Sequence, residues 1–549
     1  MTSTESTPLL SNPSIPNPDP QLPYSVLPSS QDTLTNQLPS NRFVALANKL
    51  FRNKKRITIL IAIWTGVFLG ALDATIVATL MSAISSGFSA SNQSSWLASA
   101  YLLAISITAP LYGKLSDLLG RRIASLTSIT LFLIGTIGCG ISRSINQLIL
   151  SRFIAGCGGG GIMTTSSIIA TDLFSLDQRA LIQGLGNICY GLGASLGGPL
   201  GGWINDHYGW RFAFLTQVPI LLIAWCLVSY FVDYRVATQV SNKADLLKRI
   251  DWLGSFTLMW TIVCLLLSLS FKNNLLCQWS DVRVFGTFVG FLLGLVAFIW
   301  IEARASEPIL PLRLLKLRTP LCCLGLNFFS SIVFFAILYM FPLWFETVKL
   351  TTTTQAGLHL IPNSASLSIG SLLVGAGIRL TGKYKVITVI SSVSLALGLL
   401  LLSTKLNTPI HEWADIILVG IGFSAISTAA LVAIIASIPS KDMAVCTGLT
   451  YLFRYTGQVV GVAASAALLQ SIVTGELERR IVGPGSAEII RRIRHESSIV
   501  KNLPDGLYKT AAIASYKVAL RDVFRFNLFL TLVVVALSFG VRDFPLVRP

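Results

Sequence analysis

Long apolar segments recur along nearly the whole chain, and short polar loops separate them. A run of about 20 apolar residues is long enough to cross roughly 30 Å of hydrocarbon as an α-helix. From Ile57 onward the pattern predicts fourteen such spans, so we expect an all-α polytopic membrane protein. The predicted spans are 57–80, 95–112, 123–141, 147–170, 180–204, 212–232, 253–271, 283–301, 321–345, 356–380, 386–403, 414–437, 444–472 and 523–541.

The composition excludes an ordinary soluble domain. The chain has 549 residues, of which 53% are hydrophobic and 12% are charged, whereas soluble domains carry about 25% charged residues. The net charge of +17 arises mostly from Lys and Arg in short loops between apolar segments, where such residues set orientation in a membrane. We therefore expect a lipid bilayer around the chain and no nucleic acid as partner.

Basic residues lie mainly on one side of the predicted spans. With the amino terminus in the cytosol, 24 Lys and Arg fall in cytosolic segments and 6 fall in the short loops on the opposite side. This asymmetry follows the positive-inside rule. It predicts that both termini are cytosolic.

The first 50 residues have a different composition from the rest. They are rich in Pro, Ser, Thr and Asn and cannot bury a core, so we expect a disordered cytosolic tail. Within it, Glu5 stands four positions before Leu9 and Leu10. This spacing resembles the acidic dileucine signal by which vesicle-sorting adaptors direct cargo to lysosomes or vacuoles.

Glycines indicate an internal repeat. Gly193 and Gly197 recur as Gly457 and Gly461, both at an offset of 264. Gly113 and Gly120 are similarly matched by Gly375 and Gly382 at an offset of 262. Parallel repeats of six spans are a known plan of transporters. The repeat predicts two six-helix bundles with two extra helices between them.

The domain boundaries follow from this repeat. We expect a cytosolic tail over 1–50, an N-terminal bundle over 51–235, two linker helices over 236–318, and a C-terminal bundle over 319–545. A luminal loop at 473–522 carries many charges, so we expect a solvated loop there. The alternative is an amphipathic segment on the membrane surface.

The loop after the second span holds the strongest motif, which consists of Gly113, Asp117, Gly120, Arg121 and Arg122. Glycine lets two helix ends approach closely. Asp117 can cap a helix or pair with a basic group, and the two arginines hold the cytosolic face. We interpret the loop as a charged latch that forms in one conformation and breaks in another.

This loop resembles the signature loop of the major facilitator superfamily. Two further motifs resemble those of its fourteen-span drug:proton antiporters. One is Leu72-Asp73-Ala74-Thr75 in the first span, and the other is Arg152 followed by glycines in the fourth. The fifth span resembles the antiporter motif Gly-Pro-x-x-Gly-Gly. The residues concerned are Gly193, Gly197, Gly198, Pro199, Gly201 and Gly202, with the proline one place nearer the last glycines, which leaves antiport versus symport open.

Three stretches are similar to those of fungal vacuolar basic amino acid transporters. They are Leu72–Met81, Ser95–Tyr101 and Pro110–Asp117. The resemblance implies transport of a small cationic substrate, namely Lys, Arg or His, from the cytosol into the vacuole in exchange for protons. The dileucine pattern favours the same vacuolar location.

Asp73 is the first candidate for coupling. An ionisable side chain in mid-membrane costs about 2.5–3.5 kcal/mol on insertion scales, so function is its default explanation. Asp73 lies 16 residues into its span, about 24 Å from the cytosolic start. One carboxylate there can hold either a proton or a cationic substrate. The alternative is a helix cap, or a permanent pair with an arginine.

Three other charged residues complete the candidate set. Arg152 is the expected counter-charge of Asp73 or of a substrate carboxylate. Arg454 is a second arginine within a span, at the repeat position of Tyr190. Glu346 could extend an acidic path for an ammonium or guanidinium group, or it could be an interfacial residue at a helix end.

Two other functions stay open. One is a plasma-membrane exporter of drugs or siderophores, and the other is a non-transporting nutrient receptor. We expect no enzyme, since no catalytic set of residues gathers on one face. The scattered Cys and His residues predict no metal site and no cofactor. Asn92 begins a glycosylation sequon, close to the second span.

Overall fold

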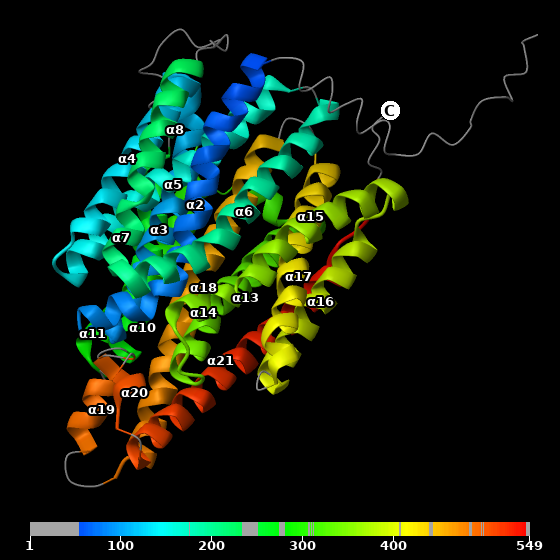
Figure 1. The fold of residues 1–549 in the computed structure, drawn as a ribbon. Coiled ribbons are helices and arrows are strands. Elements are labelled where there is room, and N and C mark those ends of the chain that lie inside the picture. Colours follow the sequence, from blue (N-terminus) through cyan, green and yellow to red (C-terminus); the bar gives the residue numbers. More distant parts are fainter. Residues whose placement is uncertain are drawn as a thin grey trace, which may run out of the picture. The chain divides into compact units, whose positions relative to one another are not determined.

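The computed structural model describes residues 54–544 except for 175, 233–250, 274–279, 306–307, 309, 311, 406–407, 439–442, 483–485, 496, 498 and 505. In this part of the chain the secondary structure is entirely helical (Figure 1). The sorting pattern at Glu5, Leu9 and Leu10 lies outside the described residues.

The first half, residues 54–232, is a bundle of helices that contact one another (Figure 1). Its helices are α2 (Lys54–Gly87), α3 (Ser94–Leu119), α4 (Arg121–Ile141), α5 (Ile145–Leu173), α6 (Leu176–Tyr208), α7 (Trp210–Leu215) and α8 (Gln217–Phe231), with a 3₁₀ turn η1 (Ser91–Gln93) after α2.

The second half, from α13 onward, forms a similar bundle. Its helices are α13 (Arg318–Thr347), α14 (Thr353–Leu358), α15 (Ile361–Thr381), α16 (Lys385–Lys405), α17 (Pro409–Ser437), α18 (Met443–Arg480), α19 (Ser486–His495), α20 (Ile499–Asn502) and α21 (Leu507–Gly540). The short α12 (Leu312–Leu315) leads into α13.

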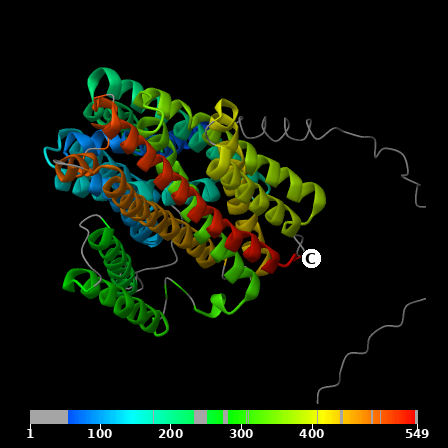
Figure 2. The same cartoon turned by 90° about the horizontal axis from the view of Figure 1, so that it is seen from below.

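Two helices stand between the halves in sequence. They are α10 (Trp252–Asn273) and α11 (Val282–Glu302), which pack as a hairpin. Figure 2 shows this green pair beside the bundles, and α10 contacts α18 and α3. Most large apolar side chains of α11 are exposed, for example Val282 at 83% and Leu293 at 65%. Such a surface suits a helix that faces lipid.

Twelve helical segments of the described part are long and apolar enough to cross a membrane. They correspond to twelve of the fourteen predicted spans. The other two, 95–112 and 180–204, are helical in α3 and α6. The apolar run of α3, Trp96–Ala109, is shorter than the rest. Fourteen spans and the cytosolic placement of both termini therefore stay predictions.

The predicted loop at 473–522 is wrong in extent. Helix α18 continues to Arg480 and α21 begins at Leu507, so helix occupies much of it. Glu476 accepts hydrogen bonds from Arg480 at 2.8 and 2.7 Å, one helical turn away. Such pairs support a helix beyond its apolar part, and hydropathy does not register them.

The rest of that segment is also helical rather than a plain solvated loop. In α19, Ile490 and Ile493 are buried while Arg491 and Arg492 are exposed. This amphipathic division matches the alternative considered above for this stretch.

Close glycine contacts recur in both halves, as the repeat requires. In each half two glycines of one helix meet backbone carbonyls of another, and an added Cβ would lie 2.3–2.4 Å from the oxygen. These contacts join α6 to α2 and α18 to α13. They are Gly193 with Phe68 and Gly197 with Leu72 in the first half, and Gly457 with Phe328 and Gly461 with Ile332 in the second.

The two halves meet firmly at the end of the bundle that contains Ser91, which we call the Ser91 end. There, Asp206 of α6 accepts hydrogen bonds from the amide of Thr354, at 3.2 Å, and from its hydroxyl. A Cβ on Gly357 would lie 2.4 Å from the carbonyl oxygen of Gly198. At the opposite end, which we call the Arg121 end, Gly113 and Gly375 face open space.

Candidate substrate site and latch

Asp73 and Arg152 form an ion pair in the middle of the first half. Arg152 Nη1 on α5 lies 2.7 Å from Asp73 Oδ2 on α2, and both side chains are 1% exposed. The predicted pairing of these two residues, 79 positions apart, is thus present in the structure. Both charges lie away from water, so each is stabilised by the opposite charge of its partner.

The pair leaves one polar atom of each partner unsatisfied. Asp73 Oδ1 and Arg152 Nη2 are buried and have no hydrogen-bond partner among the described residues. Arg152 Nε donates to the carbonyl of Leu97 at 3.2 Å. A buried ion pair stabilises a fold only when its remaining atoms are also bonded. The arrangement therefore favours binding a further charged or polar group over a purely structural role.

Glycines of α5 make room for the aromatic side chain beside the pair. The Arg152 guanidinium lies 4.2 Å from the centre of the Tyr101 ring on α3. A Cβ on Gly159 would lie 2.7 Å from the Tyr101 hydroxyl, and one on Gly156 would lie 2.3 Å from its backbone oxygen. The glycines after Arg152 thus bring α3 and α5 together around this tyrosine.

Two further tyrosines, Tyr190 of α6 and Tyr339 of α13, were not predicted as site residues. Tyr339 of α13 is buried, and its hydroxyl has no hydrogen-bond partner in the part of the chain that the structure describes. It interacts electrostatically with Asp73, Arg152 and Tyr190. A hydroxyl within an apolar span was the only sequence signal for Tyr339. These tyrosines link the ion pair to the second half of the molecule.

Arg454 lies on α18, in the second half. Its Nη2 is 3.4 Å from Asn327 Oδ1, and its guanidinium is 5.6 Å from the centre of the Tyr451 ring. Its Nε is buried, and no described residue forms a hydrogen bond with it. Arg454 acts electrostatically on Tyr190, the residue that the repeat equates with it. The second half thus adds a positive charge to the site.

Glu346 is not part of this central group. It lies in the last turn of α13, at the Ser91 end, and its Oε1 is buried with no hydrogen-bond partner within the described ranges. The structure therefore separates the predicted coupling residues into a central set and one carboxylate near the closed end.

The junction between α3 and α4 holds an ion pair. Gly120 has φ +86° where the two helices join. Arg121 Nε lies 2.9 Å from Asp172 Oδ2 on α5, and Arg121 Nη1 donates to Ser116 at 3.0 Å. Asp172 was not predicted. The side chain of Asp117 lies outside the described residues, and Arg122 is exposed.

The antiporter-type glycines of α6 pack two helices against it. Gly193 and Gly197 approach α2 as described above. Gly201 faces Ile76 of α2, while Gly198 and Gly202 meet α14 of the second half. Pro199 lies inside α6. This motif therefore positions helices and holds the Ser91 end together.

The structure says less about the glycosylation sequon and about metal binding. Asn92 lies in η1, with its side chain outside the described residues. Among the residues that the structure describes, no three His, Cys, Asp or Glu side chains gather to hold a metal ion.

Comparison with known proteins settles the family. Residues 63–462 match the sequence model described as Major Facilitator Superfamily. The chain belongs to the major facilitator superfamily. It is a membrane transporter of that family and not an enzyme. This confirms the superfamily resemblance of the latch loop and its neighbours.

Two curated relatives come from Schizosaccharomyces pombe. Multidrug resistance protein fnx1 is 40% identical over 84% of this chain and 88% of its own. Vacuolar membrane amino acid uptake transporter fnx2 is 34% identical over 89% of this chain and 84% of its own. Among the similar proteins are thus both a multidrug resistance protein and a vacuolar amino acid transporter.

A solved structure supports the fold. An inward-facing, occupied bacterial homologue of the human lysosomal transporter Spinster superposes with a TM-score of 0.60 at 15% identity. The match covers 89% of this chain and 97% of the other. At this identity the likeness concerns the fold alone.

Proposed function

We propose that this transporter moves basic amino acids from the cytosol into the vacuole in exchange for protons. The observation that carries the proposal is the buried Asp73–Arg152 pair with one unsatisfied atom on each partner. The 34% identity to a protein named as a vacuolar amino acid uptake transporter supports the substrate class.

The two unsatisfied atoms suit an amino acid that carries an extra positive charge. Asp73 Oδ1 accepts from the ammonium or guanidinium of the substrate, and Arg152 Nη2 donates to its α-carboxylate. Arg454 and the hydroxyl of Tyr339 supply further polar contacts from the second half. A substrate that carries both a side-chain cation and an α-carboxylate thus supplies hydrogen-bond partners for Asp73 Oδ1 and Arg152 Nη2.

Proton exchange follows from competition at Asp73. A proton on Asp73 removes its charge, and the substrate cation then loses its partner. In an acidic lumen the carboxyl takes up a proton and releases the cation there. At neutral cytosolic pH it loses the proton and binds the next substrate. Asp73 therefore binds either the proton or the substrate cation, and never both at once.

The contact between halves fits the loading step of this cycle. With both termini in the cytosol, as the basic loops predict, the closed Ser91 end faces the lumen. The site would then be open from the cytosol through the Arg121 end. We further propose fourteen spans, with α3 and α6 among them, and sorting to the vacuole through Glu5, Leu9 and Leu10.

A multidrug exporter is the second candidate, favoured by the 40% identity to a multidrug resistance protein. Uptake into isolated acidified vacuolar vesicles separates the two. We expect labelled Lys, Arg or His to accumulate in vesicles with the transporter and to leak away when the pH gradient is collapsed. Accumulation of a lipophilic cation without any basic amino acid would favour the second candidate.

Location gives an independent test. A tagged chain should label the vacuolar membrane, and Leu9→Ala/Leu10→Ala should shift it toward the cell surface. Labelling of the cell surface by both forms would contradict the vacuolar assignment.

A further inference from the structure

Arg454 carries a positive charge within a membrane-spanning helix, and the groups that bond to it are neutral. Its guanidinium donates to the amide oxygen of Asn327 and lies 5.6 and 6.0 Å from the ring centres of Tyr451 and Phe423. No Asp or Glu in the described part of the chain forms an ion pair with it. Because a charge inside a membrane span is costly, an arginine without an acidic partner points to a ligand.

The two arginines of the central set differ in this respect. Arg152 is 1% exposed and pairs with Asp73 at 2.7 Å, so that this pair carries no net charge. Arg454 is only half-buried, and its positive charge is left over. A guanidinium has five N–H donors in a planar fork that matches a carboxylate. Arg454 therefore suits the carboxylate of a ligand.

The internal repeat gives the depth of Arg454 in the molecule. The matched glycine contacts of α6 with α2 and of α18 with α13 set an offset of 260 between α2 and α13. By this offset its partner Asn327 corresponds to Val67, six residues before Asp73. Six residues of α-helix span about 9 Å, and parallel halves related by an axis along the membrane normal place equivalent residues at equal depth. Arg454 thus bonds at a level about one and a half helical turns from Asp73.

This level lies on the Arg121 side of Asp73. Helix α2 ends shortly before Ser91, so the residues that precede Asp73 in α2 lie toward the opposite end of the bundle. Helix α18, which carries Arg454, also contacts α3 of the first half. Arg454 is therefore on a helix at the junction of the halves, between the Arg121 end and the ion pair.

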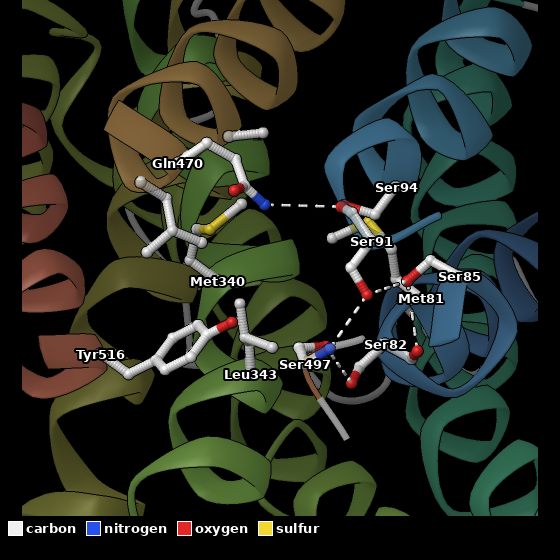
Figure 3. Close-up of a pocket in the computed structure, with 12 residues that line it drawn as sticks. Met81, Ser82, Ser85, Ser91, Ser94, Met340, Leu343, Gln470, Ser497 and Tyr516 are labelled. Carbon is white, nitrogen blue, oxygen red and sulfur yellow. Dashed lines mark hydrogen bonds between the residues drawn. The ribbon is translucent and has the colours of Figure 1, made fainter. Parts of the chain in front are cut away.

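The Ser91 end offers no route for a substrate in this conformation (Figure 3). Ser91 Oγ accepts from the amide of Ser497 at 3.1 Å, and the Ser91 carbonyl accepts from Gln470 Nε2 at 3.5 Å. These bonds join the first half to the second. The pocket that the three residues line has a volume of about 30 Å³, which has room for water but not for an amino acid. A molecule that comes from the Arg121 end therefore meets Arg454 before Asp73.

We propose that Arg454 selects the substrate by its carboxylate: it binds an entering cation that carries a carboxylate and repels a cation that lacks one. The carboxylate neutralises the guanidinium while the side-chain cation of the substrate reaches on to Asp73. The carboxylate passes to Arg152 when the whole substrate has reached the ion pair. An unpaired charge that opposes the wrong ligand is a general source of specificity.

The inference rests on the proposed function for the identity of the cation and for entry through the Arg121 end. Its test compares uptake of labelled L-lysine and labelled cadaverine, which is lysine without its carboxylate, in proteoliposomes with the Arg121 end outward and an acidic interior. The variants are Arg454→Gln and Arg454→Lys. Arg211→Gln is the matched control, because Arg211 also lies over aromatic rings, namely Phe88 and Trp210, but at the Ser91 end.

We expect Arg454→Gln to act on the two molecules in opposite directions. It should lower kcat/KM for lysine by about tenfold, since a charge-assisted hydrogen bond is lost. It should raise kcat/KM for cadaverine at least about threefold, since a like charge is removed. Arg454→Lys keeps the charge and should still exclude cadaverine, while Arg211→Gln should leave the preference for lysine as in the wild type. An equal fall for both molecules in Arg454→Gln, or an unchanged preference, would overturn the inference.

A chemical readout keeps this test separate from the substrate question. Phenylglyoxal modifies accessible arginines, and peptide mass spectrometry reports the modified fraction of Arg454. Lysine and 6-aminohexanoate both carry a carboxylate and should protect Arg454, whereas cadaverine should not. Equal protection by all three molecules, or by none, overturns the selection by carboxylate. Protection by the two carboxylates in a transporter that fails to accumulate lysine would instead refute the proposed substrate and retain the role of Arg454.

Discussion

The two halves of the molecule share a scaffold but not its charges. Their helix pairs repeat the same glycine contacts, so Phe68 corresponds to Phe328 and Leu72 to Ile332, both at an offset of 260. By this offset the position of Asp73 is occupied by Val333 in the second half. In the same way, Gly158 and Gly422 pack on Phe132 and Leu395. Their offset of 264 equates Arg152 with Ile416.

The residues that replace Asp73 and Arg152 in the second half show what the scaffold requires at these positions. Val333 and Ile416 are both fully buried, so these positions accept ordinary hydrophobic packing. The ion pair of the first half is therefore not required to hold such a bundle together. Since a buried ion pair is often no more stabilising than apolar residues of similar volume, the needs of the scaffold alone do not explain the pair in the first half.

The largest effect should come from Asp73→Asn. This change keeps the shape of the side chain but removes its charge and its proton. We expect uptake driven by a pH gradient to fall by at least about 100-fold, because an amide at this position binds neither the proton nor the substrate cation. Vesicle uptake of labelled lysine, normalised to the amount of correctly located protein, measures it. Uptake within about threefold of wild type would remove Asp73 from the mechanism.

The double variant Asp73→Val/Arg152→Ile makes the first half resemble the second. Breaking the pair at one residue leaves an uncompensated buried charge, whereas removing both charges leaves none. We expect the double variant to melt at a higher temperature than Asp73→Asn and still to lack transport. A scanning fluorimetry measurement in detergent gives the first quantity and vesicle uptake the second. A double variant less stable than either single one would show that the ion pair belongs to the scaffold.

The loop that we interpret as a latch also differs between the halves. In the first half the side chains of Arg121 and Asp172 meet at 2.9 Å. In the second half the corresponding loop is held through backbone amides, since Asp543 accepts from Tyr384 and Lys385 at 3.1 and 2.9 Å. A carboxylate at the start of a helix such as α16 is a stable arrangement. We infer that the first-half contact is the one that opens and closes.

Arg121→Ala should therefore lower the turnover rate by about tenfold and change the KM little. The reason is that this partly exposed ion pair stabilises one conformation of the transport cycle and does not contact the substrate. Asp172→Asn should reproduce this effect, and the two changes together should add little more. Asp543→Asn is the matched change in the second half and should reduce stability without this loss of turnover. An increase in KM as the main effect of Arg121→Ala would contradict a latch.

The sequence predicted the helical architecture and the central ion pair because both depend on local patterns. Apolar length identifies a span, and a lone Asp or Arg within a span must find a partner. Asp172 and Tyr339 were missed because their roles come from helix packing, which brings together residues distant in the chain. The end of α18 was missed because Glu476 and Arg480 look like loop residues when hydropathy is the only measure.

The smallest effects on transport should come from the glycines that both halves share. In Gly193→Ala and Gly457→Ala the new methyl group would meet a backbone oxygen at 2.3 Å in each case, so a helix must shift. Overpacking of this kind costs about 1–3 kcal/mol. We expect a similar fall in melting temperature for both variants, while Gly113→Ala, which faces open space, should show none.

The folded protein that remains should transport at a rate near wild type, because neither methyl group reaches the ion pair. A much larger loss of transport from Gly193→Ala than from Gly457→Ala, at equal stability, would mean that the α2–α6 contact positions Asp73. The scaffold and the chemistry of the first half could then no longer be separated.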